Sequence, residues 1–163
     1  MKVQEITATN DTEMAKILRT DLEDLHLNLP GTAYYDPFVD HLSRWYDKTA
    51  NAKYYVAVSD DHHVMGGCGV GPIAPEDGIA ELQKLYVSPN YRRQGVAKAL
   101  IPECFEFAKQ HYGYLYLETF HQMTAANNLY RSLGFDPVPY TPLRAHETVL
   151  TLVCRLLLGK KKH

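Results

Sequence analysis

The chain has 163 residues, of which 45% are hydrophobic and 22% are charged. That length supports one well-buried core and is short for two ordinary domains, so we expect a single domain over residues 1–163. The formal net charge of −2 gives no bulk attraction to nucleic acid or to anionic membranes. We therefore expect no nucleic-acid partner and no membrane partner, and the basic tail GKKKH is interpreted as a solvated terminus.

The cysteines and histidines predict no metal site. Cys68, Cys104 and Cys154 are odd in number and widely separated, and no CxxC occurs. Neither a disulfide framework nor a zinc site is indicated, which is typical of a reducing compartment. The first residues contain no apolar run of signal-peptide length, and no run reaches the roughly 18 apolar residues of a membrane span. A cytoplasmic location is therefore expected.

The spacing of apolar residues predicts the elements and their order. In chain order they are a strand over residues 2–8, a helix over 13–27, a helix over 37–48, strands over 53–59, 63–73 and 78–88, a helix over 93–111, a strand over 113–119, a helix over 125–134 and a strand over 146–157. Asn10 or Thr12 can cap the first helix, and Gly134 can close the last one. Pro102 lies inside the helix over 93–111, where it removes an amide hydrogen bond and is expected to cause a kink. The predicted fold is α+β, with a mixed, mainly antiparallel central sheet of about seven strands flanked by about four helices.

Two stretches resemble phosphate-binding loops. GVGPIA, residues 69–74, approximates a dinucleotide fingerprint, but Pro72 and Pro75 prevent it from opening a helix, so it is interpreted as part of a strand. The stretch YVSPNYRRQGVAKAL, residues 86–100, has the required context, because a strand and a turn lead directly into an amphipathic helix. Amides at a helix start have no partners within the helix and favour anions.

The second of these stretches carries a family resemblance. LYVSPNYRRQGVAKAL resembles the acetyl-CoA motif of the GNAT superfamily of N-acetyltransferases, whose pattern Q/R-x-x-G-x-G/A is matched by Arg92, Gly95 and Ala97. A second stretch, YLYLETFHQMTAANNLYRSLGF, is similar to the strand and helix that follow in these enzymes. Both matches occur in the family's order, over roughly residues 53–140. The resemblance implies a GNAT-like acyl-CoA N-acyltransferase fold, with acetyl-CoA as cosubstrate and no metal.

The resemblance also implies which residues bind the cofactor. Amides and basic side chains around the helix start would hold the diphosphate, and the backbone of the preceding strand would hold the pantetheine arm. The implied residues are Leu85, Tyr86, Val87, Arg92, Arg93, Gln94, Gly95, Val96, Ala97 and Lys98. One departure occurs at Met123, where many family members have an asparagine that contacts pantetheine.

Acetyl transfer to an amine requires a base and an acid. Glu81 resembles the strand base of the histone-acetylating branch, and Glu118 resembles the base of the branch that acetylates protein N-termini, so the two candidates stay open. Tyr130 matches the tyrosine that protonates the leaving thiolate, and its ordinary pKa near 10 suits that step. Either glutamate would otherwise be an ordinary residue of the sheet, and Tyr130 would otherwise be core packing.

The sequence leaves the acceptor open. The most direct hypothesis is an acetyltransferase that acts on the primary amine of a small metabolite or amino acid. The alternatives are an enzyme that acetylates protein N-termini or lysines, and a CoA-responsive binding or regulatory module without catalysis. Aromatic side chains near the first helices can line an acceptor pocket or belong to the core: His26, Tyr34, Tyr35, Phe38, Trp45 and Tyr46. Family members are often dimers, so a homodimer is one option.

Overall fold

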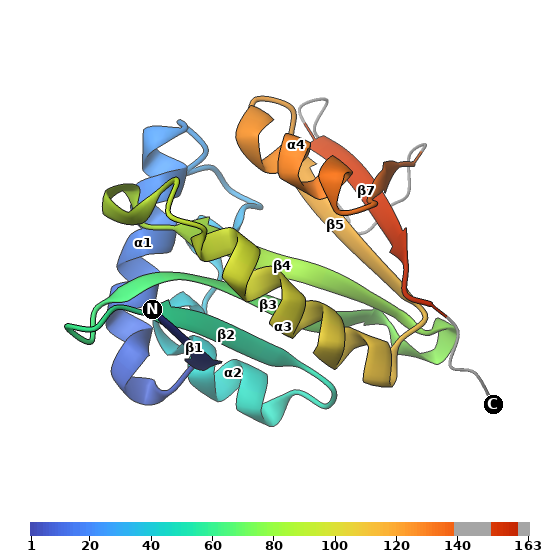
Figure 1. The fold of residues 1–163 in the computed structure, drawn as a ribbon, viewed down its shortest axis with the longest axis horizontal. Helices are drawn as coiled ribbons and strands as arrows, with labels where there is room; N and C mark the ends of the chain where they lie inside the picture. Colours follow the sequence, from blue (N-terminus) through green and yellow to red (C-terminus); the bar gives the residue numbers. More distant parts are fainter. Residues whose placement is uncertain (139–150, 160–163) are drawn as a thin grey trace. The chain divides into compact units, whose positions relative to one another are not determined.

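The computed structural model describes residues 1–138 and 151–159. The strands are β1 (Lys2–Glu5), β2 (Lys53–Val58), β3 (Val64–Ala74), β4 (Ile79–Val87), β5 (Tyr114–Phe120), β6 (Asp136–Pro137) and β7 (Thr151–Leu157). The α-helices of these residues are α1 (Asp11–Asp24), α2 (Leu42–Lys48), α3 (Val96–His111) and α4 (Thr124–Ser132). The strands hydrogen bond in the order β1-β2-β3-β4-β5-β7-β6 (Figure 1). The predicted α+β fold, with about seven strands and about four helices, is confirmed.

The strand pairing is mainly antiparallel, as predicted. Strand β1 pairs antiparallel with β2, β2 with β3, β5 with β7, and β6 with β7. Strands β4 and β5 are parallel, with Ile79–Glu81 beside Tyr114–Tyr116. The stretch GVGPIA lies in β3, as its proline pattern indicated. Of the last predicted strand, residues 146–150 lie outside the described residues.

The second and third predicted helices begin later than expected. Residues 37–48 form a short 3₁₀ turn, Val39–His41, before α2 begins at Leu42. The start of α2 is fixed from a distance, because the Asp11 carboxylate accepts hydrogen bonds from the Ser43 amide (2.9 Å) and hydroxyl (2.6 Å). Helix α3 begins at Val96, after the left-handed Gly95, and it continues through Pro102.

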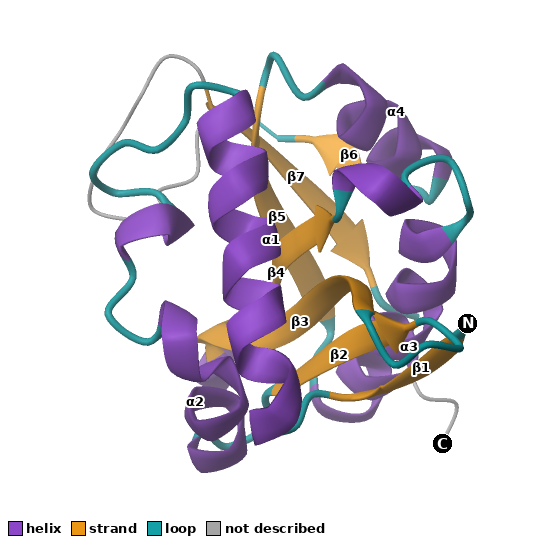
Figure 2. Cartoon of the chain, turned by 90° about the vertical axis from the view of Figure 1, so that its left-hand side faces the viewer, coloured by secondary structure: helices purple, strands orange, loops and turns teal. Residues whose placement is uncertain are grey.

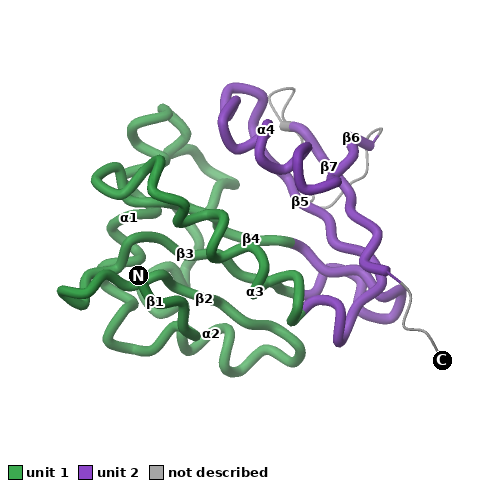
Figure 3. The backbone as a smooth tube through the Cα atoms, viewed as in Figure 1, with its two compact units in different colours: residues 1–71, 82–107 green, residues 72–81, 108–163 purple. Residues whose placement is uncertain are grey.

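The chain forms two compact units, shown in different colours in Figure 3. Unit 1 comprises residues 1–71 and 82–107, and unit 2 comprises residues 72–81 and 108–163. Strands β3 and β4 therefore contribute residues to both units. The expectation of a single domain over residues 1–163 stays a prediction.

In the described part of the chain, no helix combines the length and the apolar character that crossing a membrane requires.

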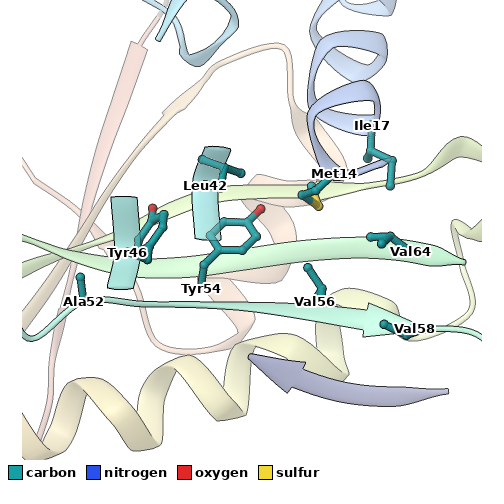
Figure 4. Packing of buried hydrophobic residues seen from close by; sticks show 9 residues of the cluster. All are labelled: Met14, Ile17, Leu42, Tyr46, Ala52, Tyr54, Val56, Val58 and Val64. Atoms are coloured by element: carbon teal, nitrogen blue, oxygen red, sulfur yellow. The ribbon is translucent and has the colours of Figure 1, made fainter. Parts of the chain in front are cut away.

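Unit 1 has helices on both faces of its strands (Figure 2). Helices α1 and α2 cover one face, where their side chains and those of β2 and β3 point toward one another (Figure 4). The buried cluster on this face consists of Met14, Ile17, Leu42, Tyr46, Ala52, Tyr54, Val56, Val58 and Val64. Helix α3 covers the other face, because Val96 packs beside Gly66 and the Cys104 thiol contacts the Cys68 carbonyl oxygen at 3.6 Å.

Glycines of β3 make room for one aromatic ring in this core. A Cβ at Gly67 or at Gly69 would lie 2.5 Å from the ring of Tyr54, which is far inside van der Waals contact. The Tyr54 side chain therefore lies flat against the backbone of β3. Its hydroxyl donates a 2.7 Å hydrogen bond to the carbonyl oxygen of Lys84, so the ring also connects β2 with β4.

Candidate functional site

The segment between β4 and α3 has the backbone of an anion-binding turn. Arg93 has φ 64° and Gly95 has φ 78°, so two residues of the turn are left-handed. The first hydrogen bond that closes the helix runs from the Ala99 amide to the Gly95 carbonyl oxygen at 3.0 Å. The amides of Val96, Ala97 and Lys98 therefore precede the first helical hydrogen bond, as expected for a helix start. Left-handed residues beside such amides form a concave group of N–H donors.

Gly95 is needed for its conformation and leaves open space beside it. A Cβ built at Gly95 would meet no atom within 4 Å, and the residue is exposed. Packing within the protein therefore does not select glycine here, whereas the positive φ does. An exposed turn with unfilled space in front of helix-start amides has the form that a diphosphate requires, so these residues fit coenzyme A.

Other side chains of the turn hold it in place. The Gln94 amide group donates a 3.2 Å hydrogen bond back to the Asn90 carbonyl oxygen. Val96 is buried against β3, where it anchors the first turn of α3. Arg93, Gln94 and Lys98 are exposed, so the two cations can face solvent or a bound phosphate.

Arg92 has a partner that the sequence analysis missed. Its Nη2 atom lies 2.8 Å from the Asp21 Oδ1 atom of α1, and its side chain is 50% exposed. Asp21 is only 4% exposed, and it also accepts a hydrogen bond from the backbone of Val87 at the end of β4. A single buried carboxylate thus joins α1 to both segments that the sequence predicts for the cofactor.

The environment of Asp21 changes its acidity. Burial raises the pKa of the Asp21 carboxyl to about 6, and Asp24 acts in the same direction. The charge and hydrogen bond of Arg92 and the Val87 hydrogen bond lower the pKa, but they do not offset burial. The sequence did contain a signal for this residue. Asp21 follows Ile17 and Leu18 by four and three positions, which places an acid on the apolar face of α1.

Strand β4 has an unusual backbone conformation at Lys84, just before the residues predicted to bind pantetheine, and it continues to Val87. Lys84 has φ 51°, a conformation that is uncommon for a non-glycine residue and rare in a strand. Its carbonyl oxygen accepts the Tyr54 hydroxyl, which stabilises this conformation. Leu85, Tyr86 and Val87 follow directly, and all three are partly buried in unit 1.

The same lysine holds the segment that joins α1 and α2. The Lys84 ammonium is 2.8 Å from the Asp36 carboxylate and 5.1 Å from the centre of the Phe38 ring. Its side chain is 6% exposed. Phe38 stacks on Trp45 with a centroid distance of 4.9 Å, and the Tyr46 hydroxyl donates to the Gln83 side chain at 2.6 Å. Two of the aromatic residues singled out in the sequence, Phe38 and Tyr46, therefore contact residues of β4 in unit 1, and Trp45 contacts Phe38.

The three candidate catalytic residues lie in unit 2. Glu81 in β4 is 5% exposed and stands opposite Tyr116 of β5. Glu118 in β5 is half-buried and stands opposite Val153 of β7. Tyr130 in α4 is 7% exposed. The candidate cofactor-binding residues all lie in unit 1, so each unit holds one part of the predicted site.

Tyr130 is fixed by the end of its own helix. The Phe135 amide donates to the Tyr130 carbonyl oxygen (3.1 Å), and the Gly134 amide donates to that of Arg131 (3.2 Å). Gly134 has φ 100°, so the helix ends in the two-bond motif that a left-handed glycine allows. The Phe135 ring packs edge-on against the Tyr130 ring at 5.9 Å. The spacing of tyrosine, glycine and phenylalanine in the sequence is thus a helix-ending device that orients the tyrosine.

Met123, where many family members have asparagine, packs against β5. Its Sδ atom lies 3.7 Å from the Thr119 hydroxyl, and its amide donates to the Phe120 carbonyl oxygen at 3.0 Å. The Met123 side chain thus packs within the protein at the position where many family members have asparagine.

No group of three or more potential metal ligands occurs among residues 1–138 and 151–159.

Comparison with known proteins identifies the family. The family model described as "Acetyltransferase (GNAT) family" matches residues 15–135, which is most of the chain. The chain belongs to the GNAT acetyltransferase family. As a member of this family it is an acyltransferase, and the resemblance stated from the sequence is confirmed.

Relatives and a solved structure agree with this assignment. The chain is 31% identical over 141 residues to the "Uncharacterized N-acetyltransferase YjgM" of Escherichia coli, a match that covers 85% of this chain and 83% of that protein. It is 34% identical over 126 residues to the N-acetylaspartate synthetase of Xenopus tropicalis, covering 74% of this chain but only 38% of the frog protein. A GNAT-family acetyltransferase structure from Staphylococcus aureus superposes with a TM-score of 0.80 at 16% identity, covering 97% of this chain and 99% of that one, and so supports the fold.

Replacing Gly95 with alanine should weaken coenzyme A binding by about 5- to 30-fold. The left-handed backbone costs an alanine roughly 1–2 kcal/mol, which favours a turn whose amides point elsewhere. Isothermal titration calorimetry of Gly95→Ala with coenzyme A measures this effect. Gly78→Ala is the matched control, because Gly78 also has a positive φ of 72° but lies in unit 2, outside the turn. Equal binding by Gly95→Ala and the native chain would show that this turn does not hold the cofactor.

Proposed function

We propose that this GNAT enzyme transfers the acetyl group of acetyl-CoA to the primary amine of a small metabolite or amino acid. The observation that carries the proposal is the turn before α3, where left-handed Arg93 and Gly95 precede the first-turn amides. Acetyl-CoA supplies the thioester as acetyl donor. The turn binds the diphosphate, and the backbone of Leu85–Val87 binds the pantetheine arm as an additional strand would.

The acceptor amine must lose a proton before it can attack. With a pKa of about 10.4, roughly 4 alkylamine molecules in 10,000 are free base at pH 7, a penalty of about 4.6 kcal/mol. A carboxylate that accepts the proton, directly or through water, lowers this penalty. Glu81 and Glu118 are the two candidates. Glu81 is the more buried and Glu118 the more accessible, and both belong to strands that position side chains rigidly.

Tyr130 is proposed to donate the proton that the leaving sulfur requires. The free amine forms a bond to the acetyl carbon, the carbon–sulfur bond breaks, and the phenol proton passes to the thiolate. The proton that the amide nitrogen loses returns to the phenolate through water, so the step balances. The helix-ending motif at Gly134 and the contact with Phe135 hold the phenol ring in one orientation. A rigid donor suits general acid catalysis, because geometry is decisive for proton transfer.

A small acceptor is proposed to bind beside the segment between α1 and α2 in unit 1. The Lys84–Asp36 ion pair and the stack of Phe38 on Trp45 hold this segment close to β4. Relatives named N-acetylaspartate synthetase, 34% to 36% identical over part of this chain, support an amino-acid acceptor. Acetylation of protein N-termini or lysines remains the second candidate for the acceptor.

The proposal is tested by following thiol release from acetyl-CoA in the presence of an amine panel. We expect release to depend on a small amine or amino acid and to be absent with peptide acceptors at the same concentration. Faster release with peptides would assign the enzyme to protein substrates. Coenzyme A binding without acetyl transfer to any amine would support a regulatory module instead.

Replacing Tyr130 with phenylalanine should lower turnover by about 10- to 1,000-fold, because the general acid is lost while the ring packing is kept. The affinity for coenzyme A should change little. Tyr112→Phe is the matched control, since Tyr112 is a tyrosine of unit 2 with the same 7% exposure. An unchanged turnover number for Tyr130→Phe would remove this residue from the mechanism.

A further inference from the structure

The ion pair between Asp21 and Arg92 links two segments that are separated in the sequence. Asp21 lies in α1, whereas Val87 ends β4 and Arg92 begins the turn before α3. The carboxylate contacts both of these segments, one through a backbone hydrogen bond and one through a guanidinium 2.8 Å away. No other buried acid of α1 makes such contacts in the described structure, because Asp11 contacts Ser43 of α2.

We propose that Asp21 is a positioning residue for coenzyme A, which fixes the end of β4 and the diphosphate turn relative to each other through Val87 and Arg92. This inference rests on the proposed function. Asp21 does not itself touch the cofactor. Its carboxylate holds Arg92 so that the amides that follow keep the orientation described above, and it holds Val87 so that the pantetheine segment ends at a fixed point.

The protonation of Asp21 is linked to folding. Because the pKa in the folded chain is raised above the unfolded value, the stability that this group contributes is fully present below about pH 4. That contribution is lost as the pH rises through about 6. At neutral pH the ionised carboxylate therefore stabilises the fold less than its uncharged form would, although it pairs with Arg92.

The variant Asp21→Asn separates a positioning role of Asp21 from a purely structural one. The amide has the same shape and can still accept the Val87 hydrogen bond, but it cannot pair with the Arg92 cation. We expect the variant to be more stable than the native chain in urea at pH 7.5 and to bind coenzyme A at least tenfold more weakly at that pH. A merely structural residue would lose stability and affinity together.

The pH dependence of the affinity for coenzyme A gives a second, independent test of the role of Asp21. Arg92 and Asp24 are the charged groups that act on Asp21. Affinity measured by calorimetry for the native chain should approach that of Asp21→Asn as the pH falls from 7.5 to 5. At each pH we compare the dissociation constant of the native chain with that of Asp21→Asn as a ratio. The ratio cancels the protonation of the coenzyme A phosphates, because this affects both proteins equally.

A control variant and the possible outcomes complete the experiment. Asp40→Asn removes the exposed ion pair with Arg19 (2.7 Å), and its affinity for coenzyme A should match the native value. If the native chain does not bind coenzyme A at any pH, the proposed function itself fails. If the native chain binds and Asp21→Asn binds equally well or more tightly at pH 7.5, the role of Asp21 is wrong. A ratio that does not change with pH would also overturn it.

Discussion

The left-handed backbone before α3 is the constraint on which the proposed site depends. If a strand ran directly into a helix, the first amides of that helix would face the end of the preceding strand. Positive φ values at Arg93 and Gly95 instead turn the chain, and Val96 then anchors the helix start in the core. The result is a helix of 16 residues whose first amides have no partner within the helix, which gives the partial positive charge a fixed position.

The residues proposed for cofactor binding and for catalysis belong to different units. Unit 1 holds the turn before α3, Leu85–Val87 and the segment between α1 and α2, whereas unit 2 holds Tyr130 and both glutamates. Family membership supports acyl transfer. A shared fold does not by itself name the acceptor, which depends on the side chains of the individual site.

Local signals predicted most of the fold, because strands, helices and turns depend on neighbouring residues. Gly134 ends α4 as predicted, and the prolines of GVGPIA correctly excluded a nucleotide loop. The start of α2 was mispredicted because it depends on Asp11, which lies far away in the sequence. The pairing of Arg92 with Asp21 has no local signal for the same reason, since the two residues are 71 positions apart, and the cofactor role of Arg92 stays a prediction. The positive φ of Lys84 has no local signature, because lysine is not a residue that favours it.

The close packing of the Tyr54 ring against the glycines of β3 limits which substitutions this strand tolerates. Glycine is a poor strand former, so replacing it with valine or threonine is a common way to strengthen a strand. In β3 that route is closed, because any side chain at Gly67 or Gly69 would displace the ring. Displacement would also remove the hydroxyl from the Lys84 carbonyl and release the unusual backbone of β4. Substitutions at these two glycines that aim at greater heat resistance would therefore alter the segment proposed to bind the cofactor before they improved the core.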